Sequence, residues 1–343
     1  METLNKSSFN RILIIQTAFL GDVLLTLPII HHLRKARPDY KISILVKSEL
    51  KEIQDIYPYA EFLFIDKSSK VKSIIETVKI IRKKYDIVIS PHRSYRSAII
   101  SYLSKTPIRI SFDKSSLNFV YTHVIKYQSR VHEIERNLSL IEPIIGKVNW
   151  KEQIRLNLLN YVFNEEFMNW KNRNDKVIVV APGTVWETKR YPEYYYAILI
   201  RKLIDLGFKV VLIGTSNEFE LGYRIVKYIK NDYSLLNLVG KLSLKESISL
   251  IQLSDLLICN DSAPTHMGVF TETPIITIYG STVPEFGFYP FREKDKIMQV
   301  ENLPCKPCGI HGYKKCPEKH FKCMLDLKPD LICEKVKEVL NIN

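Results

Sequence analysis

The sequence lacks the long apolar runs that a membrane-spanning helix requires. No run reaches the roughly 18 apolar residues that cross a bilayer. The polar start, Met1 to Asn10, leads into an apolar stretch that contains Gln16 and Asp22, which is not the pattern of a secretory signal peptide. These absences indicate a cytoplasmic protein. The 343 residues, 46% hydrophobic and 25% charged, suit two globular domains.

The common nucleotide and nucleic-acid signatures are also missing. The chain contains neither the G-x-G-x-x-G fingerprint nor a Walker A motif, which argues against a dinucleotide oxidoreductase and a P-loop enzyme. It has no RNP-type aromatic strand, no paired zinc finger and no basic zipper. A nucleic-acid-binding protein therefore remains an alternative on charge alone.

Six cysteines are present, and four of them form a cluster. Without a secretory signal, disulfides are not expected. Cys305, Cys308, Cys316 and Cys323 follow the spacing C-x2-C-x7-C-x6-C, with His311 and His320 nearby. A structural zinc site is one interpretation. The second half lacks a C-x2-C pair, so we favour reduced thiols and no metal.

Positive charge is concentrated in the first half of the chain. Residues 1–150 carry 24 Lys and Arg against 14 Asp and Glu, whereas residues 151–343 carry 26 against 23. Such a half attracts anions, for example a phosphorylated substrate or an acidic lipid surface. A compositional bias with solvated charges is the alternative.

Strand-like apolar runs alternate with segments of helical period, which predicts βαβ units and parallel sheets. Strands are expected at 11–17, 41–46, 62–65, 87–90, 176–181, 209–214, 236–239, 255–259 and 274–279, and helices at 22–36 (with Pro28 at a kink or another special position), 71–84, 193–206, 218–231, 243–253, 265–270 and 331–340. The fold class is therefore α/β, with two Rossmann-like domains facing a cleft. We expect domains at 1–160 and 175–325, joined by a polar stretch. A C-terminal helix at 326–343 would pack back toward the first domain.

Three loops carry candidate chemistry, each between a predicted strand and a helix. In the first, Gly21 permits a tight turn, and Asp22 could act as a general base or simply cap the helix. In the second, Thr184 offers a hydroxyl, and Lys189 could hold a diphosphate or lie in solvent. The third contains Asp261, Ser262 and His266.

That third loop opens a short helix after an apolar strand. Helix N-termini bind phosphates through free N–H groups. The alternatives are that Asp261 and Ser262 only cap the helix, and that His266 is a buried structural histidine.

Together these loops resemble glycosyltransferase family 9, the ADP-heptose:lipopolysaccharide heptosyltransferases. The opening RILIIQTAFLGDVLLTLPIIHHLRKARPDYKISILV is similar to that family's first βαβ unit. The segment APGTVWETKRYP resembles its PGA-x-W-x-x-KRWP loop, and NDSAPTHMGVFTETPIITIYGST resembles its NDSGPMHLAAAL-x-x-P-x-x-x-x-FG-x-T segment. The order and spacing match over nearly the whole chain.

The resemblance implies the two-domain GT-B fold and a cytoplasmic, inverting, metal-independent transfer of heptose from ADP-heptose to the lipopolysaccharide inner core. It implies no cofactor. Asp22 would activate the acceptor hydroxyl and Lys189 would hold the donor phosphates. The donor-binding residues implied are Thr184, Lys189, Glu218, Leu242, Asp261, Ser262, Ala263 and His266. Ala263 stands where the family usually has glycine, which bears on the donor more than on the reaction type.

On the acceptor side, PHRSYRS at 91–97 resembles the segment before an acceptor-side helix. Arg93, Arg96 and Arg109 would meet the anionic groups of the lipopolysaccharide core, or else are exposed solubilising residues. We also expect peripheral contact with the inner face of the inner membrane. Another GT-B transferase or an epimerase is the main alternative, and Kdo and heptose both remain open as acceptor sugars.

Overall fold

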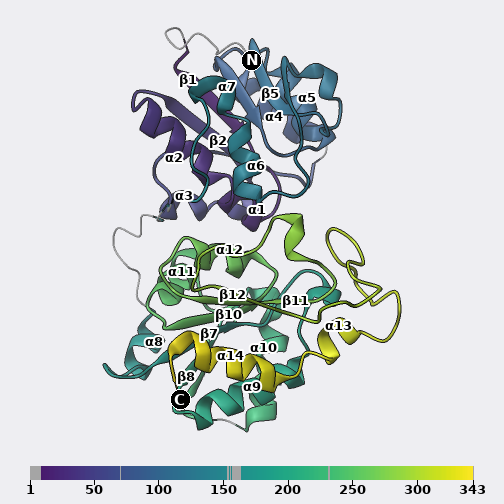
Figure 1. The fold of residues 1–343 in the computed structure, drawn as a ribbon. Coiled ribbons are helices and arrows are strands. Elements are labelled where there is room, and N and C mark those ends of the chain that lie inside the picture. Colours follow the sequence, from purple (N-terminus) through teal and green to yellow (C-terminus); the bar gives the residue numbers. More distant parts are fainter. Residues whose placement is uncertain are drawn as a thin grey trace. The chain divides into compact units, whose positions relative to one another are not determined.

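The computed structural model describes residues 9–69, 71–152, 154, 156, 164–230 and 232–342. The chain divides into two compact units, Met1–Asn157 and Leu158–Asn343, each of which is described by itself (Figure 1). Part of the polar stretch expected to join the domains, 157–163, lies outside the described residues, as does Asn231 at the end of one predicted helix.

The first unit contains a six-stranded parallel sheet. Its strands are β1 (Arg11–Ile15), β2 (Lys41–Lys47), β3 (Glu61–Ile65), β4 (Ile87–Ser90), β5 (Ile108–Phe112) and β6 (His123–Ile125). The spatial order β3-β2-β1-β4-β5-β6 is that of a doubly wound Rossmann sheet. Strands β1 and β4 are central and almost fully buried, which explains their continuous apolar runs.

Helices cover this sheet. They are α1 (Leu20–Leu24), α2 (Leu27–Ala36), α3 (Ile53–Ile56), α4 (Lys72–Ile81), α5 (Tyr95–Leu103), α6 (Glu133–Ser139) and α7 (Glu142–Ile145), with 3-10 turns at Ser48–Leu50 and Asn118–Val120. The helix predicted over 22–36 is divided in two at Leu25 and Thr26. Pro28 occupies the special position that was expected of it, because it lacks an N–H and is accommodated at the start of α2.

The second unit repeats the same topology. Its strands are β7 (Val177–Ala181), β8 (Lys209–Leu212), β9 (Leu235–Asn237), β10 (Leu256–Asn260), β11 (Ile275–Tyr279) and β12 (Lys296–Gln299). They lie in the order β12-β11-β10-β7-β8-β9, again all parallel. The expected α/β class with two Rossmann-like domains is thus confirmed.

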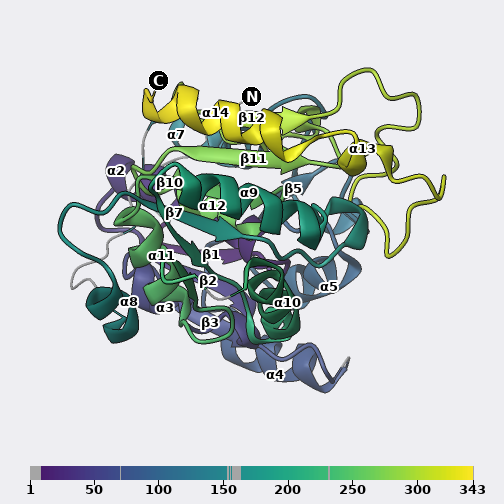
Figure 2. The ribbon, with the colours of Figure 1, turned by 90° about the horizontal axis from the view of Figure 1, so that it is seen from below.

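The helices of this unit are α8 (Glu165–Trp170), α9 (Glu193–Asp205), α10 (Phe219–Ile229), α11 (Leu244–Gln252), α12 (Ala263–Val269), α13 (Lys322–Leu325) and α14 (Pro329–Leu340), with 3-10 turns at Glu187–Lys189, Ser216–Glu218 and Pro284–Phe286. Helix α14 packs against α9 (Figure 2). Its Ile332, Cys333 and Val336 join the core of this second unit. Helix α14 thus contributes to the core of the second unit.

Candidate active site

The order of strands in the second unit reverses between β7 and β10, and ligands of doubly wound sheets bind at the carboxyl ends of such strands. The loop at 182–192 follows β7 and the loop at 261–262 follows β10. Two of the three loops singled out in the sequence therefore meet at one point of this sheet.

Asn260 ties these two loops together. It is fully buried at the end of β10. Its Nδ2 donates to the carbonyl of Pro182 at 2.8 Å, and its Oδ1 accepts from the backbone N–H of Tyr191 at 2.9 Å. Both bonds join parts of the chain that lie far apart in sequence, so the side chain fixes the start and the end of the loop that carries Lys189.

Lys189 and Asp261 form an ion pair between the loops. The Lys189 Nζ lies 2.6 Å from Asp261 Oδ2, and the side chains are only 13% and 7% exposed. The same carboxylate oxygen accepts a hydrogen bond from Thr282 Oγ1 at 2.7 Å. The cation is thus held at the carboxyl edge of the sheet, partly accessible to an anionic ligand.

The backbone beside Lys189 is supported by the cysteine-rich segment. Thr188 Oγ1 accepts from the Tyr313 N–H at 2.8 Å and lies 2.9 Å from Ser281 Oγ. A Cβ on Gly312 would lie 3.1 Å from Lys189 Cγ, so this glycine packs directly against the lysine. The segment around residues 305–323 therefore acts as a wall for the Lys189 side chain.

The four clustered cysteines are free thiols. Cys308 Sγ donates to the carbonyl of Cys305 at 3.1 Å, and Cys305 Sγ lies 3.9 Å from His320 Nε2. Burial raises the pKa of Cys323 to about 12, so this thiol stays protonated at neutral pH. Across the described part of the chain, no three His, Cys, Asp or Glu side chains are arranged to hold a metal ion, and the zinc interpretation gains no support.

The remaining residues of the β10 loop lie in α12 or just before it. Ser262 Oγ donates to the Asn260 carbonyl at 3.2 Å, and Ala263 begins the seven-residue helix. His266 is buried, and burial lowers its pKa to about 4 although Asp261 opposes the shift, so the ring is neutral. Its Nδ1 is buried and has no hydrogen-bond partner among the described residues.

Glu218 reaches the same edge from the loop after β8. Its Oε2 accepts from the N–H of Thr215 at 2.8 Å. A Cβ built on Gly183 would lie 1.8 Å from Glu218 Oε1, so only glycine allows this approach. Leu242, half-buried, follows β9, and Thr184, buried, follows β7. The implied donor residues thus all lie in loops after four neighbouring strands or at the start of α12.

In the first unit, the corresponding switch point lies between β1 and β4. Asp22 is half-buried in α1, where its Oδ2 accepts from the N–H of Phe19 at 3.2 Å. Asp22 is thus the third residue of the helix and bonds back to the N-cap residue Phe19, whereas the alternative left open in the sequence had Asp22 itself as the N-cap. The loop after β4 adjoins it, because Thr17 Oγ1 lies 3.0 Å from His92 Nδ1.

A second carboxylate, Glu133 on α6, lies near Asp22. Burial raises the pKa of Glu133 to about 7, its ion pair with Arg136 opposes the shift, and the negative charge of Asp22 adds to it. Helix α6 is held in place because Asn137 Nδ2 donates to the Leu25 carbonyl at 3.1 Å. The candidate base therefore has an acidic neighbour that can carry a proton near neutral pH.

Several cations follow the carboxyl ends of β3 and β4 in the chain. Arg93 lies over the Tyr127 ring, 4.2 Å from its centroid, and acts electrostatically on Glu133. Arg96 has a buried Nη1 with no hydrogen-bond partner within the described ranges. Lys67 donates to the Thr17 carbonyl. Burial, together with Lys47 and Arg96, lowers its pKa to about 8.

Arg109 lies apart from this group. It is near the start of β5, not at its carboxyl end. Its Nε donates to the Val120 carbonyl at 2.8 Å, and its Nη1 donates to the Thr106 carbonyl. These bonds tie the Arg109 guanidinium to backbone carbonyls of the turns on either side of β5.

The sequence reasoning missed Lys67, His92, Glu133 and Asn260. Lys67 had a usable signal, because it is a cation two residues after a predicted strand, where ligands bind. Glu133 had none, because only the packing of α6 brings it near Asp22. For His92, another of the missed residues, burial and the positive charge of Lys67 lower the pKa of the ring to about 4.

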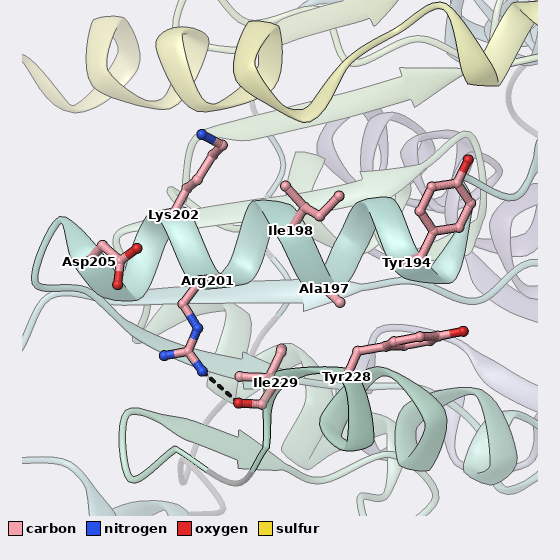
Figure 3. A pocket seen from close by; sticks show the side chains of 8 residues that line it. All are labelled: Tyr194, Ala197, Ile198, Arg201, Lys202, Asp205, Tyr228 and Ile229. Atoms are coloured by element: carbon pink, nitrogen blue, oxygen red, sulfur yellow. Dashed lines mark hydrogen bonds between the residues drawn. The ribbon is translucent and has the colours of Figure 1, made fainter.

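A surface pocket lies elsewhere, between α9 and α10 (Figure 3). Its lining includes Tyr194, Ile198 and Tyr228, while Arg201 donates to the Ile229 carbonyl. None of the candidate site residues lines it, so we place the chemistry at the strand ends instead.

Two Rossmann-like sheets with polar loops at their switch points define an α/β protein of the GT-B type. The solved structure of a glycosyl transferase family 9 protein from Veillonella parvula covers 99% of this chain and 99% of its own, with a TM-score of 0.82 and 21% identity. That of E. coli heptosyltransferase WaaC with ADP covers 96% and 99%, with a TM-score of 0.73 and 19% identity.

Sequence comparison gives the family. Residues 74–320 match Glycosyltransferase family 9 (heptosyltransferase). The lipooligosaccharide heptosyltransferase 2 of Campylobacter jejuni is 26% identical over 94% of this chain and 96% of its own length. The chain belongs to glycosyltransferase family 9 and is a glycosyltransferase. Within the described residues, no helix has both the length and the apolar character needed to cross a membrane.

Proposed function

We propose that this enzyme transfers heptose from ADP-heptose to the inner core of lipopolysaccharide, inverting the anomeric centre and needing no metal ion. Family membership supports the class of reaction. The Lys189–Asp261 pair at the carboxyl edge of the second sheet carries the donor assignment. Among proteins of this fold, E. coli heptosyltransferase WaaC has been solved with ADP.

Lys189 would stabilise the diphosphate as it leaves. When the bond between the heptose C1 and the phosphate oxygen breaks, negative charge grows on ADP, and a preorganised cation in a partly buried site lowers the energy of that state. Asp261 holds the ammonium group in place before the donor arrives. Glu218, beside Gly183, offers a carboxylate for a hydroxyl of the nucleotide or sugar.

Asp22 would take the proton of the attacking hydroxyl. A carboxylate in hydrogen-bond reach of an acceptor hydroxyl raises its nucleophilicity as the new C–O bond forms. Direct attack on C1 from the side opposite the leaving diphosphate inverts the centre. The cations Arg93, Arg96 and Lys67 follow β4 and β3 at the same edge of the first sheet as Asp22, and they suit an anionic acceptor.

Metal independence is proposed because Lys189 supplies the positive charge that a divalent cation provides in other transferases. The sequence places no D-x-D pair after a strand near the donor loops. Transfer measured in excess EDTA should match transfer in magnesium. Complete loss in EDTA, restored by magnesium, would overturn this part of the proposal.

The donor assignment is tested by thermal melting with nucleotides. ADP should raise the melting temperature, because a ligand that binds only the folded state stabilises it. UDP at the same concentration serves as the matched control. A shift with UDP and none with millimolar ADP would show that the donor is a different nucleotide sugar.

A further inference from the structure

The ring of Tyr127 contacts two arginines at the carboxyl edge of the first sheet. Tyr127 lies two residues after the end of β6, which is parallel to β5 and therefore ends at the same edge as the other strands. The Cζ atom of Arg93 lies 4.2 Å from the centroid of this ring, and that of Arg136 lies 4.6 Å from it. One aromatic side chain thus holds two guanidinium groups, which differ in the rest of their contacts.

Arg136 is a structural partner of the ring. Its side chain is only 1% exposed, and its Nη1 forms an ion pair with Glu133. Its Nε donates to the Gln128 carbonyl at 2.6 Å, and its Nη2 donates to the Val131 carbonyl at 3.0 Å. All three nitrogens of this guanidinium have partners inside the protein, so Arg136 supports the ring and is not available to a ligand.

Arg93 is exposed, and its donors are available. Its backbone is fixed, because its carbonyl accepts from the Ser116 N–H at 3.0 Å. Within the part of the chain that the structure describes, the Arg93 guanidinium makes no hydrogen bond or ion pair besides its contact with the ring. A guanidinium that lies over an aromatic ring keeps the N–H donors in its own plane for a carboxylate or a phosphate.

The Tyr127 ring is itself held by the ends of two strands. Its backbone N–H donates to Asp113 Oδ1 at 2.8 Å, and the Asp113 N–H donates in turn to the Ile125 carbonyl at 2.9 Å. The ring of Phe112, 1% exposed, lies perpendicular to it with the centroids 5.4 Å apart. A side chain fixed in this way restricts where the Arg93 guanidinium can lie.

Glu133 supplies the counter-charge of this arrangement. Two guanidinium groups near one ring repel each other unless a negative charge lies between or beside them. The Glu133 carboxylate pairs with Arg136 and interacts electrostatically with Arg93 and with Asp22. The arginine that has free donors is therefore connected, through one carboxylate, to the proposed base.

We propose that Tyr127 is a positioning residue of the acceptor site, which holds the Arg93 guanidinium ready for an anionic group of the acceptor. An arginine side chain loses rotamer freedom when it binds a ligand, and one that is already held in place loses less. The inference rests on the proposed function in one respect, that the acceptor is anionic. Tyr127 acts through Arg93 and takes no part in the bond-forming step.

Calorimetric titration with deacylated, heptose-deficient lipopolysaccharide, without a donor, tests this role. Tyr127→Leu should weaken binding of this acceptor about three- to tenfold, the effect of losing one cation–π contact. Tyr127→Phe should bind as the wild type does, because the ring remains and its hydroxyl has no hydrogen-bond partner among the described residues. Tyr102→Leu is the matched control, because it removes a ring that lies 4.7 Å from the Lys105 ammonium at the far end of α5, and it should leave binding unchanged.

A double variant separates positioning from a general loss of structure. Arg93→Ala should weaken acceptor binding about tenfold or more, and Tyr127→Leu should add little in that background, because the ring acts only through Arg93. Tyr127→Leu alone should raise the acceptor KM by the same factor as the dissociation constant, with kcat and ADP affinity unchanged. Additive losses, weaker ADP binding, or a Tyr127→Phe variant as weak as Tyr127→Leu would each overturn the proposal.

The contact itself can be tested in the wild type by NMR, so the proposal does not depend on the folding of Tyr127→Leu. The Arg93 Hδ signals, assigned by their loss in Arg93→Lys, should be shifted upfield by the ring, and unshifted signals would overturn the proposal. Acceptor binding that depends on Tyr127, without transfer from ADP-heptose, would support the positioning role and contradict the proposed function. Transfer with an unchanged acceptor KM in Tyr127→Leu would do the reverse.

Discussion

Replacing Lys189 by methionine should separate its part in stability from its part in catalysis. The change keeps the aliphatic stem and removes the charge that lies 2.6 Å from Asp261. Asp261, 7% exposed, would then keep only the Thr282 hydroxyl among the bonds described for its carboxylate. Removing one partner of a buried ion pair leaves an uncompensated charge and costs about 3–5 kcal/mol.

The double variant Lys189→Met/Asp261→Asn should recover most of that loss. With both charges gone, no buried charge remains unpaired, and the amide that replaces the Asp261 carboxylate can still accept from Thr282. Urea denaturation of the wild type, both single variants and the double variant gives the coupling energy of the pair. We expect the double variant to be nearly as stable as the wild type.

Recovery of stability should not restore function. The double variant should still lack ADP-induced stabilisation and transfer, because no other group replaces the ammonium beside the diphosphate. A double variant that binds ADP as tightly as the wild type would refute the assignment of Lys189 to the donor. A single variant of unchanged stability would refute the buried-pair argument itself.

Four further predictions concern individual residues of the two sites. Asp22→Asn should lower kcat by about 10²–10⁴-fold with ADP binding unchanged, because general-base catalysis is typically worth that factor, and a variant that keeps more than about a tenth of the activity would leave only the capping role. Gly183→Ala should lower the unfolding free energy, measured by urea denaturation, by about 0.5–2 kcal/mol, because the new Cβ displaces Glu218 from its hydrogen bond with the Thr215 N–H. The same substitution should have little effect in the Glu218→Ala variant, which already lacks that bond. The pKa of Glu133 is raised to about 7 from 4.5, so the protonated side chain stabilises the fold fully below pH 4.5 and this contribution is lost as the pH rises through 7. The wild type should therefore lose about 3 kcal/mol of unfolding free energy, measured in urea, between pH 4.5 and 8, and Glu133→Gln should not. The same dependence of stability on pH in both proteins would contradict this prediction. Arg96→Ala should raise the acceptor KM by roughly tenfold or more without changing ADP affinity, since a hydrogen bond to a charged group contributes about 1.5–3 kcal/mol, and unchanged acceptor kinetics would remove Arg96 from the site.

The sequence predicted the strands and loops whose residue pattern lies within a few consecutive residues. Buried central strands such as β1 and β10 appear as continuous apolar runs, and the loops after them carry Asp22 and Asp261. Strand β12 was missed, because it is a partly buried edge strand that has only two apolar residues, between Lys296 and Gln299 at its ends. Strand β5 was missed because Arg109 and Ser111 interrupt its apolar pattern.

The candidate site was predicted as separate loops and not as a bonded arrangement. That Lys189 pairs with Asp261 depends on Asn260 joining two strands that are neighbours only in the folded sheet. The proximity of Glu133 to Asp22 likewise depends on helix packing. The partners of Arg109 could not be predicted from its residue type, because they are backbone carbonyls supplied by other turns.

Transfer of heptose from ADP-heptose can be measured by following the sugar itself. Purified protein is incubated with ADP-β-heptose and a heptose-deficient lipopolysaccharide acceptor, with UDP-sugars as the control donors and EDTA present throughout. We expect release of ADP together with a new α-linked heptose, assigned by NMR at its anomeric carbon, and no transfer from UDP-sugars. A β-linked product would contradict inversion, and turnover of a UDP-sugar without turnover of ADP-heptose would contradict the proposed donor and function.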